Sequence, residues 1–247
     1  MNSLTPNISK PDKPLNVCII NGQSAVIKAR LILDYIRDHD FDIVAMTESW
    51  FCAGNHDQKA KGDITAPGYE LRCVSRVGKR GVGVALLFRE TLSISENVDL
   101  TSPSAEAIAM SVTHDAITIR LIVPYPPPKA PRGNDFFSNF ADTIDQYSLM
   151  SGQLPIVGGY NIHWDCNENV ITKRLIDLLV STNLVQNVSE PTHRDGYIIG
   201  LAVTRQDDNI VHMTSVHSMI SDHMAIRIHL NMSKPRRPTR TVSRRKR

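Results

Sequence analysis

Five polar residues stand where predicted strands begin or end, and together they offer the chemistry of a binding or catalytic site. They are Asn21, Glu48, Asn161, Asp222 and His223. A single polar residue at a strand end is unremarkable, because most strands end in polar residues. Carboxylate, amide and imidazole groups at the tips of four separate strands, around an apolar core, raise the alternative of a shared site, which spacing alone does not establish.

The position that decides between catalysis and its loss is Gly159, in the segment 156–163 (IVGGYNIH). A short apolar run there meets glycine and then a polar pair, which is typical of a buried strand that delivers polar side chains into a site. A catalytic strand tip is expected to carry a carboxylate, and Gly159 has no side chain. Whether the chain is an enzyme or the remnant of one depends on this position.

The elements that must position these residues follow an α/β pattern. Apolar periodicity predicts a strand over 15–20, a helix over 28–39 and a second strand over 41–46, with polar residues after both strands. Such a β-α-β unit favours parallel strands and a site beyond their carboxyl ends. Further strands are expected over 81–88, 106–112, 117–123, 154–157, 198–203 and 219–230, and further helices over 136–150 and 172–182. The proline-rich run from Pro124 is expected to stop the strand before it.

Length and composition are those of an ordinary globular protein. The 247 residues are enough for one α/β domain or two small ones, and 41% of them are hydrophobic. No apolar run approaches the roughly 20 residues of a membrane-spanning helix, so no membrane partner is expected. Residues 1–14 are polar, lack the apolar core of a signal peptide and are expected to be disordered. The four cysteines have no paired spacing, which fits reduced thiols in an intracellular protein.

Positive charge is concentrated near the C-terminus. Residues 234–247 contain eight Lys or Arg and no acid, so the net charge of +3 for the whole chain leaves −5 for the remainder. Segment 232–247 is expected to be a disordered basic tail or linker after a domain over 15–231. A linker to a further domain and a nuclear-localisation signal are alternatives to a phosphate-binding role. The candidate phosphate contacts in this segment are Arg236, Arg237, Arg244 and Arg245.

Six short motifs occur in the same order as in a known group of nucleases. They are NGQS at 21–24, TESW at 47–50, RGVGVALL at 80–87, GGYNIH at 158–163, PTHRDG at 191–196 and SDH at 221–223. Together they closely resemble the endonuclease domain of non-LTR (LINE-type) retrotransposons, over roughly residues 15–230. That domain is part of the endonuclease/exonuclease/phosphatase superfamily, like the apurinic endonucleases and DNase I. The resemblance implies a DNase I-like α/β fold, a two-sheet sandwich flanked by helices, with the site at one end of the sheets.

The resemblance also implies a reaction and a role for each matched residue. Family enzymes cleave a phosphodiester by in-line attack of water, usually with Mg²⁺, and Mn²⁺ is the alternative ion. Glu48 matches the metal-binding glutamate, Asn21 an asparagine of the metal-site network, and Asp222 a metal-binding or supporting acid. His223 matches the histidine that contacts the scissile phosphate. Asn161 matches the asparagine that donates to the phosphate or orients the attacking water.

Each matched residue also has a simpler explanation when it is taken singly. Glu48 would be a solvated acid at a strand end, and Asn21 a turn former. Asn161 would cap its loop, Asp222 would belong to a turn, and His223 would be a half-buried strand residue. The functional interpretation is favoured by the order and flanking residues of the motifs rather than by any one side chain.

Three departures from the family pattern concern catalysis. Gly159 replaces the aspartate usually assigned to activating water, and Gly200 replaces the aspartate that orients the histidine. In a Tyr-Arg-Pro-Pro-like run, Pro124 holds the place of the catalytic tyrosine and Tyr125 comes one residue late. Tyr125 is kept as the candidate catalytic tyrosine, although a one-residue shift on a strand turns a side chain to the other face. Asp165, in the loop past Asn161, is not expected to replace the missing base, because catalytic placement must hold to about 0.5 Å.

These departures leave two hypotheses. The first is a metal-dependent, DNA-nicking endonuclease of retrotransposon type whose activity is impaired or lost. The second is a non-catalytic remnant or co-opted element that serves as a nucleic-acid- or protein-binding module. A superfamily phosphatase acting on a small phosphoester or lipid head group fits the motif set less well. The resemblance further implies DNA as a partner, weak Mg²⁺ or Mn²⁺ binding, a reverse-transcriptase domain beyond this chain and a nuclear location.

Overall fold

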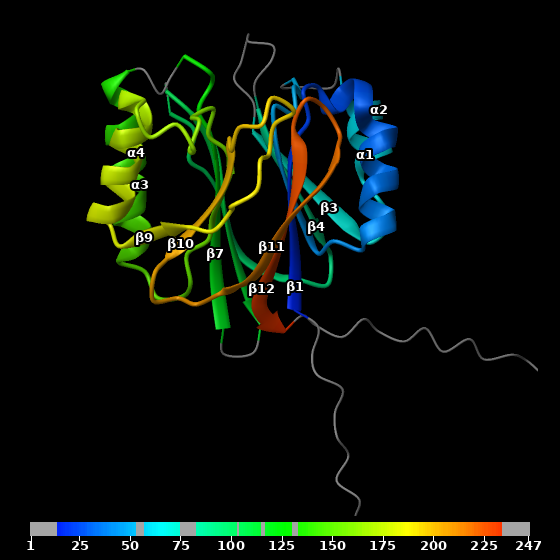
Figure 1. Cartoon of the computed structure of the whole chain (residues 1–247). Coiled ribbons are helices and arrows are strands. Elements are labelled where there is room, and N and C mark those ends of the chain that lie inside the picture. Colours follow the sequence, from blue (N-terminus) through cyan, green and yellow to red (C-terminus); the bar gives the residue numbers. More distant parts are fainter. Residues whose placement is uncertain are drawn as a thin grey trace, which may run out of the picture.

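The computed structural model describes residues 14–52, 57–74, 83–102, 104–114, 117–129 and 133–233. These residues form two six-stranded sheets packed face to face, with two helices on the outer face of each sheet (Figure 1). The predicted two-sheet α/β sandwich is confirmed. Residues 1–13 and 234–247 lie outside the described residues, so the disorder expected at both ends stays a prediction.

The first sheet is built around the N-terminal β-α-β unit, and its strand order is β11-β12-β1-β2-β4-β3. Its strands are β1 (Pro14–Asn21), β2 (Ile43–Thr47), β3 (Tyr69–Val74), β4 (Val84–Arg89), β11 (Val211–Met219) and β12 (Met224–Ser233). Helices α1 (Ala25–His39) and α2 (Gln58–Ile64) cover its outer face (Figure 1). Strands β1 and β2 are parallel, as the sequence pattern predicted.

The second sheet contains another β-α-β unit, and its strand order is β5-β6-β7-β8-β10-β9. Its strands are β5 (Ser93–Asp99), β6 (Glu106–His114), β7 (Ile117–Tyr125), β8 (Ile156–Gly159), β9 (Leu184–Gln186) and β10 (Gly200–Arg205). Helices α3 (Asn134–Ser148) and α4 (Val170–Ser181) cover its outer face. Strands β7 and β8 are parallel and are connected through α3.

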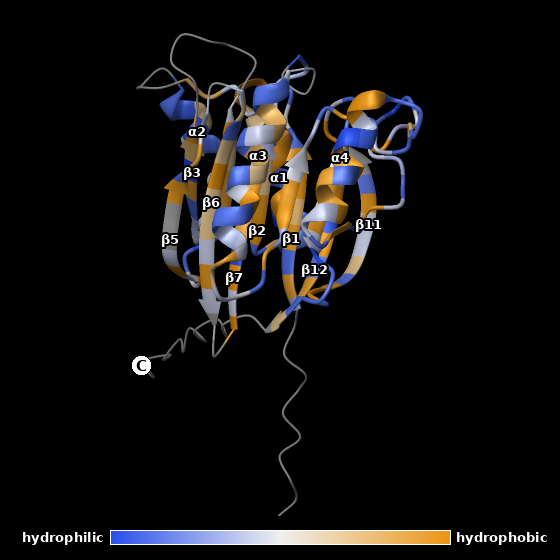
Figure 2. Cartoon of the chain, turned by 90° about the vertical axis from the view of Figure 1, so that its left-hand side faces the viewer, coloured by the Kyte–Doolittle hydropathy of each residue, from blue (hydrophilic) through white to orange (hydrophobic). Residues whose placement is uncertain are grey.

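Strand β1 shows why the sequences of the central strands are continuous apolar runs. Leu15, Val17 and Ile19 are buried in the core between the two sheets. Cys18 and Ile20 point the other way and are buried against the helical layer. Successive side chains alternate between the faces of a strand, so a strand covered on both faces must be apolar at nearly every position. Figure 2 shows the resulting concentration of hydrophobic residues along β1 and β2.

Two of the predicted elements were wrong in their limits. Segment 219–230 is not one strand, because β11 ends at Met219 and β12 begins only at Met224. Strand β7 does not stop before Pro124 but continues through it, and Pro124 pairs with Ala107. A proline is tolerated in a strand where its missing N–H faces no neighbour, and β7 pairs with β8 at Ile122, two residues before Pro124.

The strand ends that were expected to form a site do meet at one end of the sandwich. Asn21 and Thr47 are Cα partners at the carboxyl ends of the parallel strands β1 and β2. Gly159, at the end of β8, is the partner of Gly200 at the start of the antiparallel strand β10. Among the described residues, no helix is long and apolar enough to cross a membrane.

Candidate active site

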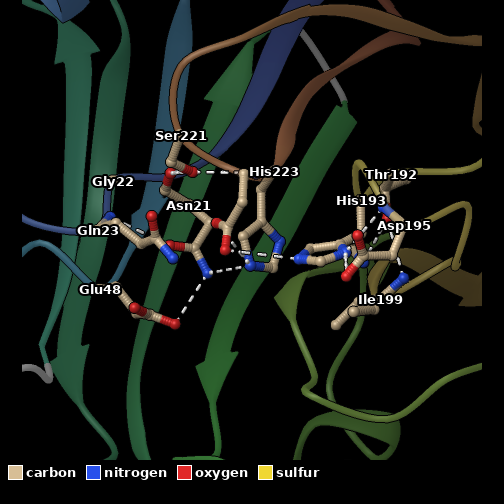
Figure 3. A network of polar contacts seen from close by, with 12 residues as sticks. Asn21, Gly22, Gln23, Glu48, Thr192, His193, Asp195, Ile199, Ser221 and His223 are labelled. Atoms are coloured by element: carbon tan, nitrogen blue, oxygen red, sulfur yellow. Dashed lines mark hydrogen bonds and ion pairs between the residues drawn. The ribbon is translucent and has the colours of Figure 1, made fainter.

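Asn21 joins Glu48 to His223 at the centre of the site. Its Nδ2 atom lies 3.0 Å from Oε1 of Glu48 and 3.3 Å from Nε2 of His223 (Figure 3). An ionised carboxylate only accepts hydrogen bonds, so the atom facing Glu48 is the amide nitrogen, and its second hydrogen is directed to an unprotonated Nε2 of His223. The end of β1, the loop after β2 and the start of β12 thereby form one network.

The loop that carries Glu48 has a constrained backbone. Glu48 has φ +50°, in the left-handed region that costs a residue with a side chain about 1–2 kcal/mol. Hydrogen bonds from the loop after β1 hold it there: the N–H of Gly22 donates to the Thr47 carbonyl at 2.8 Å, and the N–H of Ser24 donates to the Glu48 carbonyl at 3.1 Å. Left-handed residues that the surrounding structure maintains are found preferentially at functional sites.

Tyr125 and Asn161 form the polar wall on the side of β7 and β8. The Tyr125 hydroxyl is hydrogen-bonded to the side chains of Glu48 and Asn161. Burial and the nearby Glu48 carboxylate raise the pKa of this hydroxyl, so it stays protonated at neutral pH. The candidate Tyr125 thus lies beside Glu48 and Asn161, although a one-residue shift along a regular strand would turn its side chain to the other face. Tyr125 is the last residue of β7, where the regular alternation of the strand ends.

Gly159 and Gly200, the positions where the family resemblance predicts aspartates, oppose each other in one antiparallel strand pair. Side chains at such directly opposed positions project from the same face, with Cβ atoms about 4.5–5.5 Å apart. Two carboxylates there would form a like-charge pair that needs a cation or a proton to stabilise it. Two glycines remove both the acids and their repulsion.

A small cavity lies in front of Gly159. Its polar lining comes from Asn21, Thr47, Thr192 and His223 together with the two glycines. A Cβ atom on Gly159 would lie 3.0 Å from Oγ1 of Thr47 and 3.9 Å from Nδ2 of Asn21. The Thr47 hydroxyl is buried and has no hydrogen-bond partner within the part of the chain that the structure describes. A carboxylate at position 159 would accept the hydrogen bond that this hydroxyl lacks.

The space beside Gly200 has been filled by an apolar side chain. A Cβ atom on Gly200 would lie 2.5 Å from Cδ1 of Ile226, a distance that real structures do not contain. The backbone N–H groups of Ile199 and Gly200 both donate to Oγ1 of Thr192 at 2.9 Å. The strand end is therefore held in place without the aspartate, and an acid could return only if Ile226 moved.

The electrostatics of His223 and Asp222 favour a neutral imidazole beside a charged carboxylate. Burial and the neighbouring His193 lower the pKa of His223 to about 4, although the Asp222 charge opposes the shift. Burial acts to raise the pKa of Asp222, but a hydrogen bond from Gln23 and the two histidines outweigh it, and the pKa is lowered. At neutral pH His223 accepts or donates a hydrogen bond but brings no positive charge to a phosphate.

The oxygen groups of the site fit a divalent cation. Burial raises the pKa of Glu48, and the charge of Asp222 contributes in the same direction. Oδ1 of Asp222 is buried and has no hydrogen-bond partner among the described residues. Mg²⁺ and Mn²⁺ take carboxylate oxygens as ligands, and a cation here would offset the cost of burying both acids.

The structure brings most of the predicted site residues together. Asn21, Glu48, Tyr125, Asn161, Asp222 and His223 surround the end of the sandwich, and Gly159 and Gly200 line its cavity. Asp165 is directed elsewhere, since its Oδ1 accepts from the backbone N–H of Ile198 at 3.1 Å. The predicted phosphate contacts Arg236, Arg237, Arg244 and Arg245 lie outside the described residues.

Two site residues had no role assigned from the sequence. His193 places Nε2 at 3.5 Å from Oδ2 of Asp222, and its ring centroid is 4.9 Å from that of His223. Lys28 donates from Nζ to the carbonyls of Gly22 and Gln23, both at 2.8 Å, and so anchors the loop after β1. The PTHRDG motif contains His193, but only the folded chain reveals its pairing with a residue 30 positions away.

Comparisons with solved structures agree with this architecture at low sequence identity. The AP endonuclease LMAP from Leishmania major has a TM-score of 0.72 at 12% identity, with 93% of this chain and 91% of that chain covered. The 3′ phosphatase NExo from Neisseria, bound to a product DNA hairpin, has a TM-score of 0.70 at 15% identity, with 88% and 100% covered. The endonuclease domain of TRAS1, a telomere-specific non-LTR retrotransposon, has a TM-score of 0.69 at 14% identity, with 90% and 100% covered.

The sequence itself supports the same assignment. A search of curated proteins found no significant match. Residues 16–223 match the Endonuclease/Exonuclease/phosphatase family, a span that begins in β1 and ends at His223. Because this match covers most of the chain and includes every strand end of the site, the chain belongs to the endonuclease/exonuclease/phosphatase family.

Proposed function

We propose that this chain is a retrotransposon-type endonuclease domain that still binds a divalent cation and DNA phosphates but hydrolyses phosphodiester bonds far more slowly than an intact family member. The observation that carries the proposal is the position of Gly159. Its missing side chain would point at Thr47 and Asn21, beside the surviving network. The site therefore keeps its binding groups and lacks the group expected to activate water.

The surviving side chains have the chemistry that substrate binding requires. Glu48 and Asp222 would hold a Mg²⁺ or Mn²⁺ ion, with Asn21 fixing the Glu48 carboxylate through its 3.0 Å hydrogen bond. When bound, the ion neutralises negative charge on the phosphate oxygens and the leaving group. The Asn161 amide, the protonated Tyr125 hydroxyl and the neutral His223 ring would orient the phosphate by hydrogen bonding.

The lost groups are those whose absence affects rate more than binding. Loss of a general base typically reduces a rate by about 10²–10⁴-fold. Loss of an acid that orients a histidine has a comparable effect, up to about 10⁴-fold. Contributions within one catalytic unit are not additive, so the two losses are not multiplied. Either of them leaves a slow enzyme, and nothing in the network supplies a charged base at position 159.

DNA as the ligand is supported by the fold relatives. The Neisseria 3′ phosphatase is bound to a DNA hairpin, and the TRAS1 domain comes from a retrotransposon. We extend DNA binding to this chain because its six motifs resemble the retrotransposon branch and its phosphate-binding candidates survive. The basic segment 234–247 would add salt-dependent contacts with the backbone and precede a reverse-transcriptase domain in a nuclear element.

DNA binding in the presence of Mg²⁺ tests the proposal directly. We expect the affinity of the wild-type chain for a short duplex to increase with Mg²⁺, and Glu48→Ala to abolish the increase. Tyr35→Phe is the matched control, because Tyr35 lies on α1, away from the site network. An affinity that is the same with EDTA and with Mg²⁺ would contradict the proposed cation role.

The alternative is a protein-binding module that has no nucleic-acid ligand. It is favoured by one observation, that Ile226 has taken the space beside Gly200. An apolar side chain in the place of a catalytic acid stabilises the fold whether or not a phosphate binds. The alternative predicts no measurable DNA affinity at low salt with Mg²⁺, both for the wild type and for Glu48→Ala.

A further inference from the structure

His193, Asp222 and His223 offer two imidazoles and a carboxylate whose ligand atoms all lie within 4.8 Å of one another. We propose that these three residues bind a divalent transition-metal ion of the zinc class, at a site that shares Asp222 with the Glu48 site for Mg²⁺ but is completed by His193. His193 has no part in the proposed phosphate site. The transition-metal site also requires no hydrolytic activity.

The distances suit a tetrahedral ion. Nε2 of His193 lies 3.5 Å from Oδ2 of Asp222, and Nε2 of His223 lies 3.6 Å from Oδ1 of the same carboxylate. Ligands about 2.0–2.1 Å from a tetrahedral ion lie about 3.3–3.4 Å from one another. Each imidazole–carboxylate pair is thus within a few tenths of an ångström of that spacing. The two pairs use different oxygens of Asp222, so one ion would contact both imidazoles with a bidentate carboxylate or after the carboxylate turns. The rings cross at 77°, with centroids 4.9 Å apart (Figure 3).

Two of the three ligand atoms are unprotonated, although Nε2 of His223 already accepts a hydrogen bond from Asn21. The Asn21 amide donates toward Nε2 of His223, so that nitrogen is unprotonated. Oδ1 of Asp222 is buried without a hydrogen-bond partner among the described residues. A buried carboxylate oxygen that lacks a partner is costly, and a metal ion would satisfy it while replacing the long Asn21–His223 contact of 3.3 Å.

The surroundings of His193 fit the usual outer partner of a metal-binding histidine. Oδ2 of Asp195 lies 3.5 Å from Nδ1 of His193, opposite the proposed ligand atom. A carboxylate in that position fixes the tautomer in which Nδ1 carries the proton and Nε2 binds the metal. In the metal-free chain the backbone N–H of Asp195 instead donates to Nδ1 of His193 across 3.3 Å. Metal binding would replace this contact by one from a protonated Nδ1 to the Asp195 carboxylate, now 3.5 Å away.

The backbone holds the three ligands as a unit. His193 and His223 form an isolated antiparallel bridge, and the N–H of Arg194 donates to the Asp222 carbonyl at 2.9 Å. The N–H of Met224 donates to the Thr192 carbonyl at 2.9 Å. Two segments that are distant in sequence are thus fixed against each other, which limits the ordering cost of binding.

The ligand types separate this site from the Mg²⁺ site. Imidazole nitrogen suits zinc, cobalt, nickel and copper, whereas Mg²⁺ prefers oxygen ligands. Three protein ligands leave a fourth position open to water or to another ligand. Because Asp222 and His223 belong to both proposed sites, a bound transition-metal ion withdraws them from the phosphate. Zinc is therefore expected to weaken Mg²⁺-dependent DNA binding.

Titration of the EDTA-treated full chain with Co²⁺ and Zn²⁺ tests the site. We expect one equivalent of Co²⁺ to produce the visible absorption of a tetrahedral centre without a thiolate charge-transfer band, and Zn²⁺ to displace it. His193→Gln should weaken Zn²⁺ binding by more than the roughly 10–100-fold typical for loss of an outer partner. Asp195→Asn should weaken it within that range. His212→Gln, at an exposed histidine of β11, is the control and should bind as the wild type does.

The outcomes distinguish this site from the proposed function. Glu48→Ala should lose Mg²⁺-dependent DNA binding and keep its Zn²⁺ affinity. The first result tests the proposed function and the second tests the transition-metal site, so one can fail while the other holds. Equal Zn²⁺ affinity of the wild type and His193→Gln, with both chains folded by circular dichroism, would overturn the proposal. An unfolded His193→Gln chain leaves Asp195→Asn as the deciding variant, because that residue is largely exposed. Unchanged Zn²⁺ affinity in Asp195→Asn would then be the contrary result.

Discussion

The site has two sides that share one kind of scaffold and differ in their side chains. On the β1–β2 side, Asn21 and Glu48 remain hydrogen-bonded at 3.0 Å. On the β8–β10 side, Gly159 and Gly200 keep the strand register but present no side chain. The backbone geometry of such a site is set by strand pairing and the apolar core, so it persists when the reactive groups are gone. The proposed function depends on this difference, because it has fold and binding outlast catalysis in one chain.

The difference also shows on which side of the site a carboxylate can be removed without a cost in stability. Glu48 is half-buried and hydrogen-bonded to Asn21, so its removal leaves the Asn21 amide without its carboxylate partner and costs stability. Removal of two opposed carboxylates relieves a repulsion instead. At Gly200 the vacated space is occupied by Ile226. Positions 159 and 200, where two acids would repel each other, are thus the ones without a carboxylate.

Restoring the acids on the β8–β10 side is the strongest way to test this comparison. We expect Gly159→Asp combined with Gly200→Asp and Ile226→Val to raise the Mg²⁺-dependent nicking rate of supercoiled plasmid by about 10²–10⁴-fold over the wild type. Valine lacks the Cδ1 atom that blocks position 200. Adding Glu48→Ala to this variant is the control and should abolish the gain. A restored chain that binds DNA and Mg²⁺ but gains no activity would show that further catalytic groups are missing.

The pH dependence of stability tests the half-buried imidazole of His223, which lies on the side of the site that includes β1. The pKa of His223 is lowered to about 4, and an unfolded histidine titrates near 6.5. Between these values the unfolded chain takes up a proton that the folded chain refuses. The free energy of unfolding should therefore decrease as the pH falls from about 6.5 to 4, by at most about 3 kcal/mol. Denaturant titrations of the wild type and His223→Gln isolate this contribution. The pKa of Glu48 is raised, so its protonation stabilises the folded chain as the pH falls, but it does so in both chains and cancels in the comparison. Identical pH dependence of the two chains would contradict the assignment.

A double-mutant cycle tests whether Ile226 fills the place of an acid. Gly200→Asp alone should destabilise the fold by about 1–3 kcal/mol, because the new Cβ meets Cδ1 of Ile226 at 2.5 Å. Ile226→Val alone should cost about 0.5–1.5 kcal/mol. In the Gly200→Asp background the same valine should instead restore stability. Additive effects in chemical denaturation would show that the two positions do not compete for space.

The basic segment supplies the smallest expected effect. Changing Arg236, Arg237, Arg244 and Arg245 to alanine should reduce the salt dependence of DNA binding, with log–log slope falling by about 0.9 for each phosphate contact that is lost. The Mg²⁺ dependence set by Glu48 should not change. A slope equal to that of the wild type, measured by fluorescence anisotropy at several salt concentrations, would remove the segment from the DNA-binding surface.

The α/β class and the gathering of the strand ends could be predicted from the residues for physical reasons, whereas the two-sheet sandwich was implied by the family resemblance. Strands buried on both faces give continuous apolar runs, and a β-α-β order fixes which ends meet. The short elements α2, β3, β5 and β9 were missed, because a few residues do not establish a period. Strand β11 was missed as well, and the predicted strand 219–230 ran across the turn that carries Asp222 and His223.

Other features depended on tertiary contacts. The cross-strand pairing of Gly159 with Gly200 follows from the register of β8 and β10, which local sequence does not encode. The contact of Tyr125 with Glu48 depends on where β7 ends, and strand alternation alone does not specify it. The proximity of His193 to Asp222 results from a long-range bridge. These are the contacts on which the chemistry of the site depends.

The most direct test of the central claim is a single measurement of plasmid nicking by the wild-type chain in Mg²⁺, beside Glu48→Ala, at protein concentrations that saturate the DNA. If binding persists without the water-activating acid at Gly159, the wild type should bind the plasmid and nick it no more than about 10-fold faster than Glu48→Ala, well short of the 10²–10⁴-fold that a general base supplies. Rapid wild-type nicking that disappears in Glu48→Ala would contradict the claim and show that another group performs the work of the missing aspartate.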